Sequence, residues 1–477
     1  MTIYRFIAAV LPAALLSGCI TVGPDYHRPK IDVPDRWPAE KTEAAVPVRW
    51  WDSYNDPVLD AMVDEALAHN SDLALAVARL DEARAQLGVA RADQFPGVAA
   101  GAGASRNRIS EKSPLFFPGF DPTFNDLNAS VSASWEIDFW GKYRRATEAA
   151  RADLFASASN RDAVRLALIA DVARGYFNLR SLDAQIAVTR QTVKTRLDSL
   201  ELQRKRFEAG VASELELHQV EADAYSAQAL LPFLENQLAQ QETALSVLLG
   251  RSPREIIGAA PERGSVIEAI SVPPAVPAGL PSDLLERRPD LREAEQRLVA
   301  ANARIGQAKA AYFPSIPLTG AFGTESAKLA DLFTAPARVW LVSVSAAQTI
   351  FDAGRIGSQV EASRARERQA LAQYRSAIQN AFKDTQDALV AQRKARERLE
   401  AEQARVASLQ KALELARLRY DNGESSLLDV LDAERGLLGA QLDRVEAQRA
   451  QLVATADLFK ALGGGWEDQP RPRGPSG

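Results

Sequence analysis

Two long stretches of the chain carry a helical pattern of apolar positions and almost no helix-breaking residues. Residues 142–209 and 355–421 each contain no proline and a single glycine. In the first stretch apolar residues recur at the heptad spacing of a coiled-coil seam. At about 1.5 Å per residue, each stretch predicts a helix about 100 Å long, too long for a globular core. The predicted seam positions are Leu168, Val172, Gly175, Leu179, Leu182, Ile186, Thr189, Val193, Arg196, Leu200, Gln203 and Phe207.

Shorter helical patterns flank each long stretch. Glycines 210 and 423 are natural ends for the long helices, and the pattern resumes over 213–249 and 426–462. Helical patterns also precede each long stretch, over 57–94 and 282–312, and a Phe-Pro pair stops each of them. Two long helical hairpins are therefore expected, each with a shorter helix at its start.

Four short segments alternate polar with apolar or small residues, which is the period of a two-faced strand. They cover 97–105, 128–139, 315–323 and 339–350, and polar loops are expected between them over 106–127 and 324–338. Four strands cannot close into a barrel alone, so we expect closure by oligomerisation. Two chains would supply eight strands and three would supply twelve, which leaves a lumen.

The order of these elements occurs twice because the chain is duplicated. Gly210 matches Gly423 at an offset of 213 residues, and the same offset pairs Glu221 with Glu434. Earlier in each half the offset is 218, which pairs Gly88 with Gly306. A constant offset over so many matches excludes coincidence.

The amino terminus predicts export and lipid attachment. One charge, Arg5, precedes an apolar run over 6–16 that is too short to span a bilayer and suits a secretory signal. The run ends in Leu16-Ser17-Gly18-Cys19, which resembles a bacterial lipobox, so we expect cleavage before Cys19 and acylation of its thiol. Two acyl chains would anchor the protein stably, and Ile20 after the cysteine indicates the outer membrane.

Composition excludes several classes of function. The chain has 57 basic and 62 acidic residues, giving a net charge of -5, so nothing favours nucleic acid as a partner. It has one cysteine and three histidines, far apart in sequence, so a disulfide within the chain and a Cys/His metal cluster are excluded. No nucleophile–base set or phosphate loop is present, and we expect no enzyme activity and no cofactor.

The motifs resemble the outer-membrane factors of bacterial efflux pumps, the TolC-like channels, and above all their lipoprotein subgroup of the nodulation-protein T type. The resemblance runs from Cys19 to Trp466. Its motifs are Val22-Gly23-Pro24-Asp25-Tyr26, Trp50-Trp51-Asp52, residues 135–142, residues 284–291, Tyr312-Phe313-Pro314, Phe351-Asp352-Ala353-Gly354-Arg355 and residues 461–466.

The resemblance implies an α+β membrane protein of the outer membrane, lipid-anchored and with a long periplasmic extension. It implies a homotrimer whose twelve-stranded β-barrel, four strands per chain, continues into a periplasmic α-helical coiled-coil barrel. The implied partners are a periplasmic adaptor protein and an inner-membrane transporter of the resistance-nodulation-division type. The implied function is the gated exit channel of a tripartite pump that exports drugs or other toxic small molecules.

The expected organisation has six segments. They are a signal peptide (1–18), an anchor and equatorial segment (19–56), a first repeat (57–250), a Pro-rich equatorial linker (251–281), a second repeat (282–466) and a tail (467–477).

The helical tips are the expected gate and docking site. Asp429 and Asp432 lie three residues apart and share a helix face, so three copies would form a ring of six carboxylates. The resemblance adds Tyr420 and Glu216 to this gate, whereas Ser425 stands where some relatives carry a gate arginine. Spacing alone also fits an ordinary solvated face.

The expected adaptor contacts are Gly210, Val211, Ser213, Gly423, Ser425 and Ser426, which also fit simple helix capping.

Two other functions remain open on the sequence. The same fold could be an outlet for secreted proteins or peptides, and a periplasmic coiled-coil scaffold without a pore would need soluble hairpins in place of the strands. The sequence does not identify the exported substrate.

Overall fold

The computed structural model describes residues 21–34, 47–114, 116, 117, 119, 121–273 and 283–464. The chain forms two compact units, each assembled from separate stretches. Unit 1 comprises 1–30, 80–157 and 294–374, and unit 2 comprises 31–79, 158–293 and 375–477. Each unit draws on both sequence repeats, so the repeats are not themselves compact bodies.

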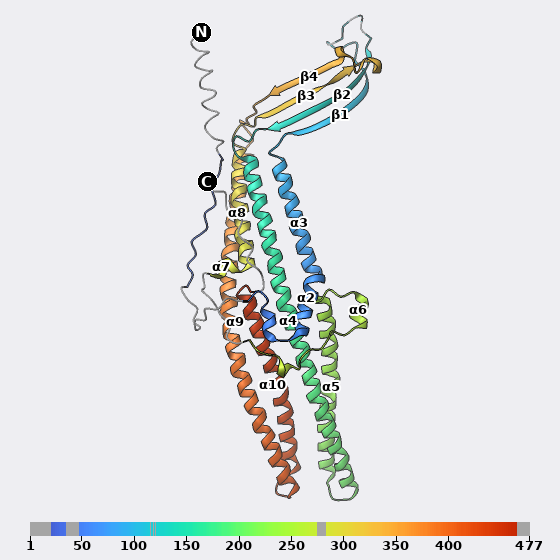
Figure 1. Ribbon diagram of the computed structural model, residues 1–477, viewed down its shortest axis with the longest axis vertical. Helices are drawn as coiled ribbons and strands as arrows, with labels where there is room; N and C mark the ends of the chain where they lie inside the picture. The colour runs from blue at the N-terminus through green and yellow to red at the C-terminus, as the bar shows by residue number, and fades with distance from the viewer. Residues whose placement is uncertain are drawn as a thin grey trace. The chain divides into compact units, whose positions relative to one another are not determined.

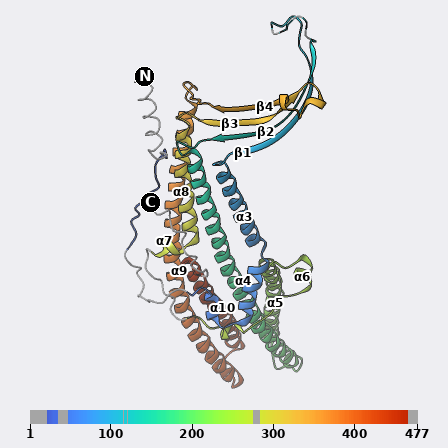
Figure 2. The same cartoon turned by 45° about the horizontal axis from the view of Figure 1, so that its top comes forward.

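Unit 1 contains one sheet of four antiparallel strands in the order β1-β2-β3-β4. The strands are β1 (Gly97–Arg108), β2 (Thr123–Glu136), β3 (Pro317–Ser326) and β4 (Arg338–Val344). They lie side by side in a curved sheet (Figure 2).

The predicted loop over 106–127 was too long. Strands β1 and β2 continue through polar residues until Arg108 pairs with Thr123. The ladder uses backbone groups, so it extends past the point where the side-chain alternation fades. At the other end of the sheet β4 stops at Val344 rather than at residue 350, and one isolated bridge, between Ser315 and Ala347, follows it.

The helices repeat in length as well as in order. The long helices α4 (Lys142–Glu208) and α9 (Arg355–Asp421) have 67 residues each. Their return helices α5 (Glu214–Leu248) and α10 (Leu427–Ala461) have 35 each. The helices that precede the strands, α3 (Ser71–Ala92) and α8 (Pro289–Ala310), have 22 each. The predicted duplication therefore holds at the level of elements (Figure 1).

Both helical patterns that precede the strands break once. Helix α2 (Pro57–His69) ends before Asn70, whose side chain accepts hydrogen bonds from the backbone of Asp72 and Leu73 and so caps α3. The short helix α7 (Leu284–Arg287) ends before Pro289 because a residue that precedes proline avoids the helical region. A further short helix, α6 (Pro253–Gly258), follows α5.

The core of unit 2 is aromatic. Trp50, Trp51 and Tyr54 are fully buried, and Trp50 stacks on Phe459 with 5.0 Å between ring centroids. Asp56 caps α2 and is itself fully buried. Segments from both ends of the chain thus meet in one core.

The helices of the described part of the chain include none that is long and apolar enough to cross a bilayer.

Candidate functional site

The predicted seam of α4 is buried in unit 2. Nine of its twelve positions are buried, Leu182 and Val193 are half-buried, and only Phe207, next to the tip, is exposed. Three seam positions are polar, namely Thr189, Arg196 and Gln203, and they lie one heptad apart. Buried polar side chains need hydrogen-bond or ionic partners. The seam over residues 189–203 therefore differs from an ordinary apolar coiled-coil seam.

The two hairpin tips are built alike. Gly210 and Gly423 have φ angles of 73° and 75°, a conformation that other residues rarely adopt. Ser213 Oγ accepts from the Glu216 backbone, and the Glu216 carboxylate accepts from Ser213 N at 2.8 Å. In the second tip the Asp429 carboxylate accepts from Ser426 N at 3.1 Å and from Ser426 Oγ at 3.2 Å.

Two of the four predicted gate residues therefore cap helices in this structure. Glu216 and Asp429 are the acidic members of capping boxes that hold the first turns of α5 and α10. The gate assignment of these residues stays a prediction. Their capping contacts show that substituting them also affects the helix ends.

The other two predicted gate residues contact arginines. Tyr420 accepts a hydrogen bond from Arg206 at 3.5 Å, which joins the end of α9 to the end of α4. Asp432 is exposed and lies 3.4 Å from Arg435 on the same helix. On the same helix Val430, Leu431 and Val445 are buried.

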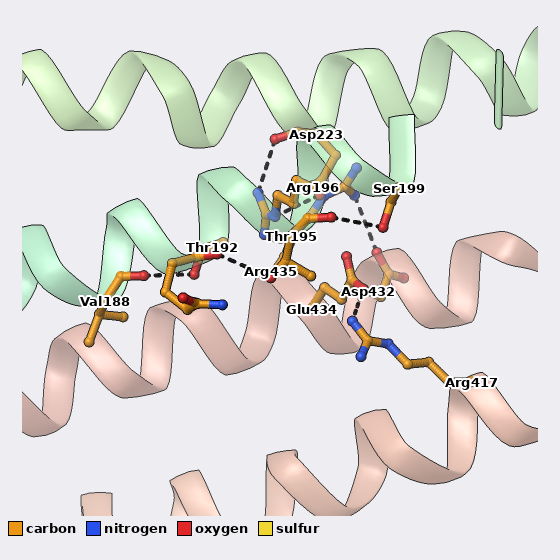
Figure 3. A network of polar contacts seen from close by, with 11 residues as sticks. Val188, Thr192, Thr195, Arg196, Ser199, Asp223, Arg417, Asp432, Glu434 and Arg435 are labelled. Atoms are coloured by element: carbon orange, nitrogen blue, oxygen red, sulfur yellow. Dashed lines mark hydrogen bonds and ion pairs between the residues drawn. The ribbon is translucent and has the colours of Figure 1, made fainter. Parts of the chain in front are cut away.

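A buried ion-pair network links the two hairpins a few turns from the tips, and the sequence patterns did not predict it. Asp223 on α5 has a side chain only 2% exposed. Its Oδ2 lies 2.9 Å from Arg196 Nε on α4, and its Oδ1 accepts from Arg435 Nε on α10 at 2.7 Å. Figure 3 shows the three side chains converging. The one local signal for this network in the sequence was Arg196, an arginine at a position of the apolar seam.

The remaining tip residues lie on the surface. Gly210, Val211, Ser213, Gly423 and Ser426 are exposed, and Ser425 is half-buried. Val211, in the turn between α4 and α5, is 75% exposed, and Leu215 in the first turn of α5 is 67% exposed. The tips thus expose backbone turns and several apolar side chains, and their role as adaptor contacts stays a prediction.

Cys19, the predicted acylation site, lies outside the described residues. The residues that follow it form a strap (residues 21–28) against the helices of unit 1. Val22 N donates to Trp140 O at 3.0 Å, Asp25 pairs with Arg145 at 2.7 Å, and Arg28 pairs with Glu295 at 2.6 Å. The hydrogen bond from Arg145 holds the pKa of the Asp25 carboxyl below its usual value.

Glycine contacts set how closely the strap packs. A Cβ on Gly23 would lie 2.4 Å from Gly306 Cα, and a Cβ on Gly306 would lie 2.6 Å from the Val22 carbonyl oxygen. Gly141 makes a similar contact with Thr21. The strap therefore fixes the chain just after Cys19 beside the residue that joins β2 to α4.

Substituting Gly306 by leucine is expected to release the strap. Overpacking costs about 1–3 kcal/mol, so chymotrypsin should cleave after Tyr26, a half-buried strap residue bonded to Glu295, at least about fivefold faster in the purified protein. Gly88 is the equivalent position in the first repeat, and a Cβ added there would have no other atom within 4 Å, so Gly88→Leu is the matched control. Equal cleavage rates in the two variants would contradict the role of Gly306.

The two faces of the sheet differ in chemistry. Val131, Phe322 and Trp340 lie opposite one another in adjacent strands, so they share a face. Phe322 is 61% and Trp340 76% exposed. The residues of this apolar face include Val98, Ala100, Ala129, Val131, Ala133, Trp135, Leu318, Phe322, Trp340, Val342 and Val344. The opposite face carries Ser130, Ser132, Ser134, Thr319 and Ser343, and on β4 it also carries the exposed Val339 and Leu341.

Comparison with known proteins identifies a family. The model of the "Outer membrane efflux protein" family matches residues 62–251 and 280–464. The chain is 34% identical over 458 residues to the "Probable outer membrane lipoprotein SilC" of Salmonella typhimurium, covering 95% of this chain and 97% of the relative. It is 34% identical over 472 residues to the "Toluene efflux pump outer membrane protein TtgC" of Pseudomonas putida, covering 97% and 96%.

The fold matches solved structures over the same extent. The CmeC outer membrane channel of Campylobacter jejuni superposes with a TM-score of 0.89 at 28% identity, covering 94% of this chain and 95% of the channel. With its two-faced sheet and its paired helical hairpins, the chain belongs to the outer membrane efflux protein family and has the fold of its channels.

Proposed function

We propose that the chain is the outer-membrane exit channel of a tripartite efflux pump and works as a homotrimer. The two-faced sheet carries this proposal. Its apolar face suits the hydrocarbon of a bilayer, and its serine face suits a water-filled lumen. Strands β1 and β4 end the sheet order at opposite edges. Pairing of β4 with β1 of the next copy satisfies both edges, and three copies close a barrel of twelve strands.

The proposed partners follow from the hairpin tips and the amino terminus. The exposed tips around Gly210 and Gly423 contact a periplasmic adaptor, which connects the channel to an inner-membrane transporter of the resistance-nodulation-division type. Acylated Cys19 anchors each protomer in the outer membrane, and the strap over 21–28 sets where that anchor sits. The channel conducts its cargo and performs no chemistry.

The gate is proposed to combine the ring of carboxylates with the buried link between the hairpins. Asp432 and Asp429 contribute exposed charges on α10, where Asp429 also caps the start of the helix. Glu216 caps the start of α5. Tyr420 and Arg206 tie the ends of α9 and α4. The pair Asp223–Arg435 holds α5 against α10, so it must open if the hairpins separate.

The cargo class is proposed from the relatives. TtgC is named for toluene efflux, and a lumen lined by small hydroxyl side chains suits neutral or cationic organic molecules rather than one specific ligand. Small toxic organic molecules are therefore the proposed cargo. Export of proteins by the same fold has no supporting observation of its own.

The test is ion conductance of the purified trimer in a planar bilayer under a potassium chloride gradient. Asp432→Asn removes three carboxylates per trimer, and we expect a severalfold loss of cation selectivity because a ring of charges sets selectivity at a constriction. Asp443→Asn is the matched control, since Asp443 lies on the same helix and pairs with Arg405 at 2.8 Å far from the tip.

The result separates three possibilities. Loss of selectivity in Asp432→Asn alone supports the gate. Equal loss in both variants would show a general surface-charge effect and contradict the gate. A membrane-inserted trimer without conductance in the wild type and in every gate variant would contradict the channel itself.

A further inference from the structure

We propose that Arg196 remains the counter-ion of Asp223 when the two hairpins separate. By doing so it makes the Asp223–Arg435 ion pair between the hairpins reversible. The inference rests on the proposed gate and concerns how that gate opens. It starts from the unequal way in which two arginines hold one carboxylate (Figure 3).

Arg196 pairs with Asp223 within the first hairpin. Both residues belong to the first hairpin, and their side chains are 4% and 2% exposed. Arg196 Nε pairs with Asp223 Oδ2 at 2.9 Å, and Arg196 Nη1 donates to the Asp223 backbone oxygen at 3.0 Å. The Nε–Oδ2 contact is an ion pair without hydrogen-bond geometry, and the hydrogen bond from Nη1 fixes the guanidinium against α5.

Arg435 contacts Asp223 from the second hairpin and is partly exposed to solvent. It belongs to the second hairpin, its side chain is 47% exposed, and it makes a single contact of 2.7 Å with Asp223 Oδ1. Asp432, one turn earlier, lies 3.4 Å away as an alternative partner. Arg435 can therefore leave Asp223 and remain solvated and paired.

The asymmetry decides whether the link can open. A buried carboxylate that loses its only counter-ion is strongly destabilised. If Arg435 were the sole partner, separation of the hairpins would leave Asp223 buried without a counter-ion. The Asp223–Arg435 ion pair would then almost never break. Because Arg196 stays with Asp223, separation exposes no unpaired buried charge.

The second repeat supplies an internal comparison. Each hairpin is closed by an equivalent ion pair, Arg204–Glu221 at 2.8 Å and Arg417–Glu434 at 2.6 Å, at the repeat offset of 213. Arg196 and Asp223, however, correspond to Leu409 and Gly436. Gly436 faces Leu409, whose Cδ2 lies 3.5 Å from the position of a Cβ.

The second hairpin thus closes without a buried charge at this level. Closing a hairpin does not require the pair Arg196–Asp223, and the neighbouring cluster of Leu200, Val220, Ala224 and Leu431 already supplies apolar packing. The charges are present only in the hairpin that receives Arg435. This is the arrangement expected if they serve the contact between hairpins.

The experiment compares opening frequencies of purified trimers in planar bilayers. Arg435→Met removes the link, and openings should become about tenfold more frequent, which corresponds to about 1.4 kcal/mol. Arg196→Met leaves Arg435 as the only partner of Asp223, so openings should become about tenfold rarer. Arg196→Lys keeps a positive charge beside Asp223 and should restore the wild-type frequency.

The sign of the Arg196→Met effect is decisive. If Arg196 merely holds the first hairpin together, Arg196→Met loosens the hairpin and openings increase, as in Arg435→Met. An increase or no change in Arg196→Met overturns the inference but leaves the gate intact. No change in Arg435→Met overturns the gate proposal, and the inference with it.

Two further variants guard against failure to fold. Arg196→Gln keeps an amide donor for the Asp223 backbone oxygen and carries the same prediction as Arg196→Met. The triple variant Arg196→Leu, Asp223→Gly, Arg435→Ala gives the first hairpin the seam residues of the second and removes Arg435. It should assemble as a stable trimer and open as often as Arg435→Met, and a low opening frequency in it would contradict the inference.

Discussion

Asp223→Ala is expected to destabilise the periplasmic hairpins by about 3–5 kcal/mol, because it leaves a buried arginine without a counter-ion. Arg196 is 4% exposed at its side chain, and no other carboxylate contacts it in the described part of the chain. The same substitution removes the contact with Arg435. Thermal unfolding of the purified protein, monitored by circular dichroism, should show a loss of many degrees.

The same variant should also be open. Since Asp223 joins α5 to both α4 and α10, its loss frees the second hairpin, and the conductance of the trimer should rise. Asp432→Ala is the matched control, because it removes an exposed carboxylate close by and should cost less than about 1 kcal/mol. Equal melting temperatures for the two variants would contradict the proposed contribution of Asp223 to the stability of the hairpins.

Asp56→Ala is expected to cost about 3 kcal/mol in the core of unit 2, because Asp56 combines a helix cap with buried charge-assisted hydrogen bonds. Its Oδ1 accepts from Val58 N at 3.0 Å. Its Oδ2 accepts from Tyr176 Oη at 2.6 Å and from Ser265 N at 3.2 Å. The carboxylate thus joins α2, α4 and the segment after α5.

Two milder variants test this account. Tyr176→Phe removes one partner of Asp56 and should cost about 1 kcal/mol, and Asp56→Asn keeps a good cap and should fall between the two. Burial and the neighbouring Asp56 both raise the pKa of Tyr176, so its hydroxyl stays a proton donor at neutral pH. A melting temperature in Asp56→Ala no lower than in Tyr176→Phe would contradict the combined role.

Local signals along the chain predicted the helices and the duplication. Heptad spacing and the two tip glycines predicted the long helices and their turns to within one residue, because these signals act over a few residues. The Phe-Pro pairs predicted the ends of the preceding helices to within two residues, at Ala92 and Ala310. Strand ends were predicted less well. Polar residues such as Arg106 and Asn107 join the ladder through backbone hydrogen bonds, which side-chain alternation does not report.

Which polar residues act together depends on how distant helices pack. Asp223 and Arg435 lie 212 residues apart, and neither belongs to a motif. Conversely, the spacing of Asp429 and Asp432 suggested one shared role, but the structure places Asp429 in a capping box and Asp432 beside Arg435. Helix periodicity fixes which face a residue occupies, whereas the partner on that face depends on how distant helices pack. That packing is a long-range property, and a local pattern cannot encode it.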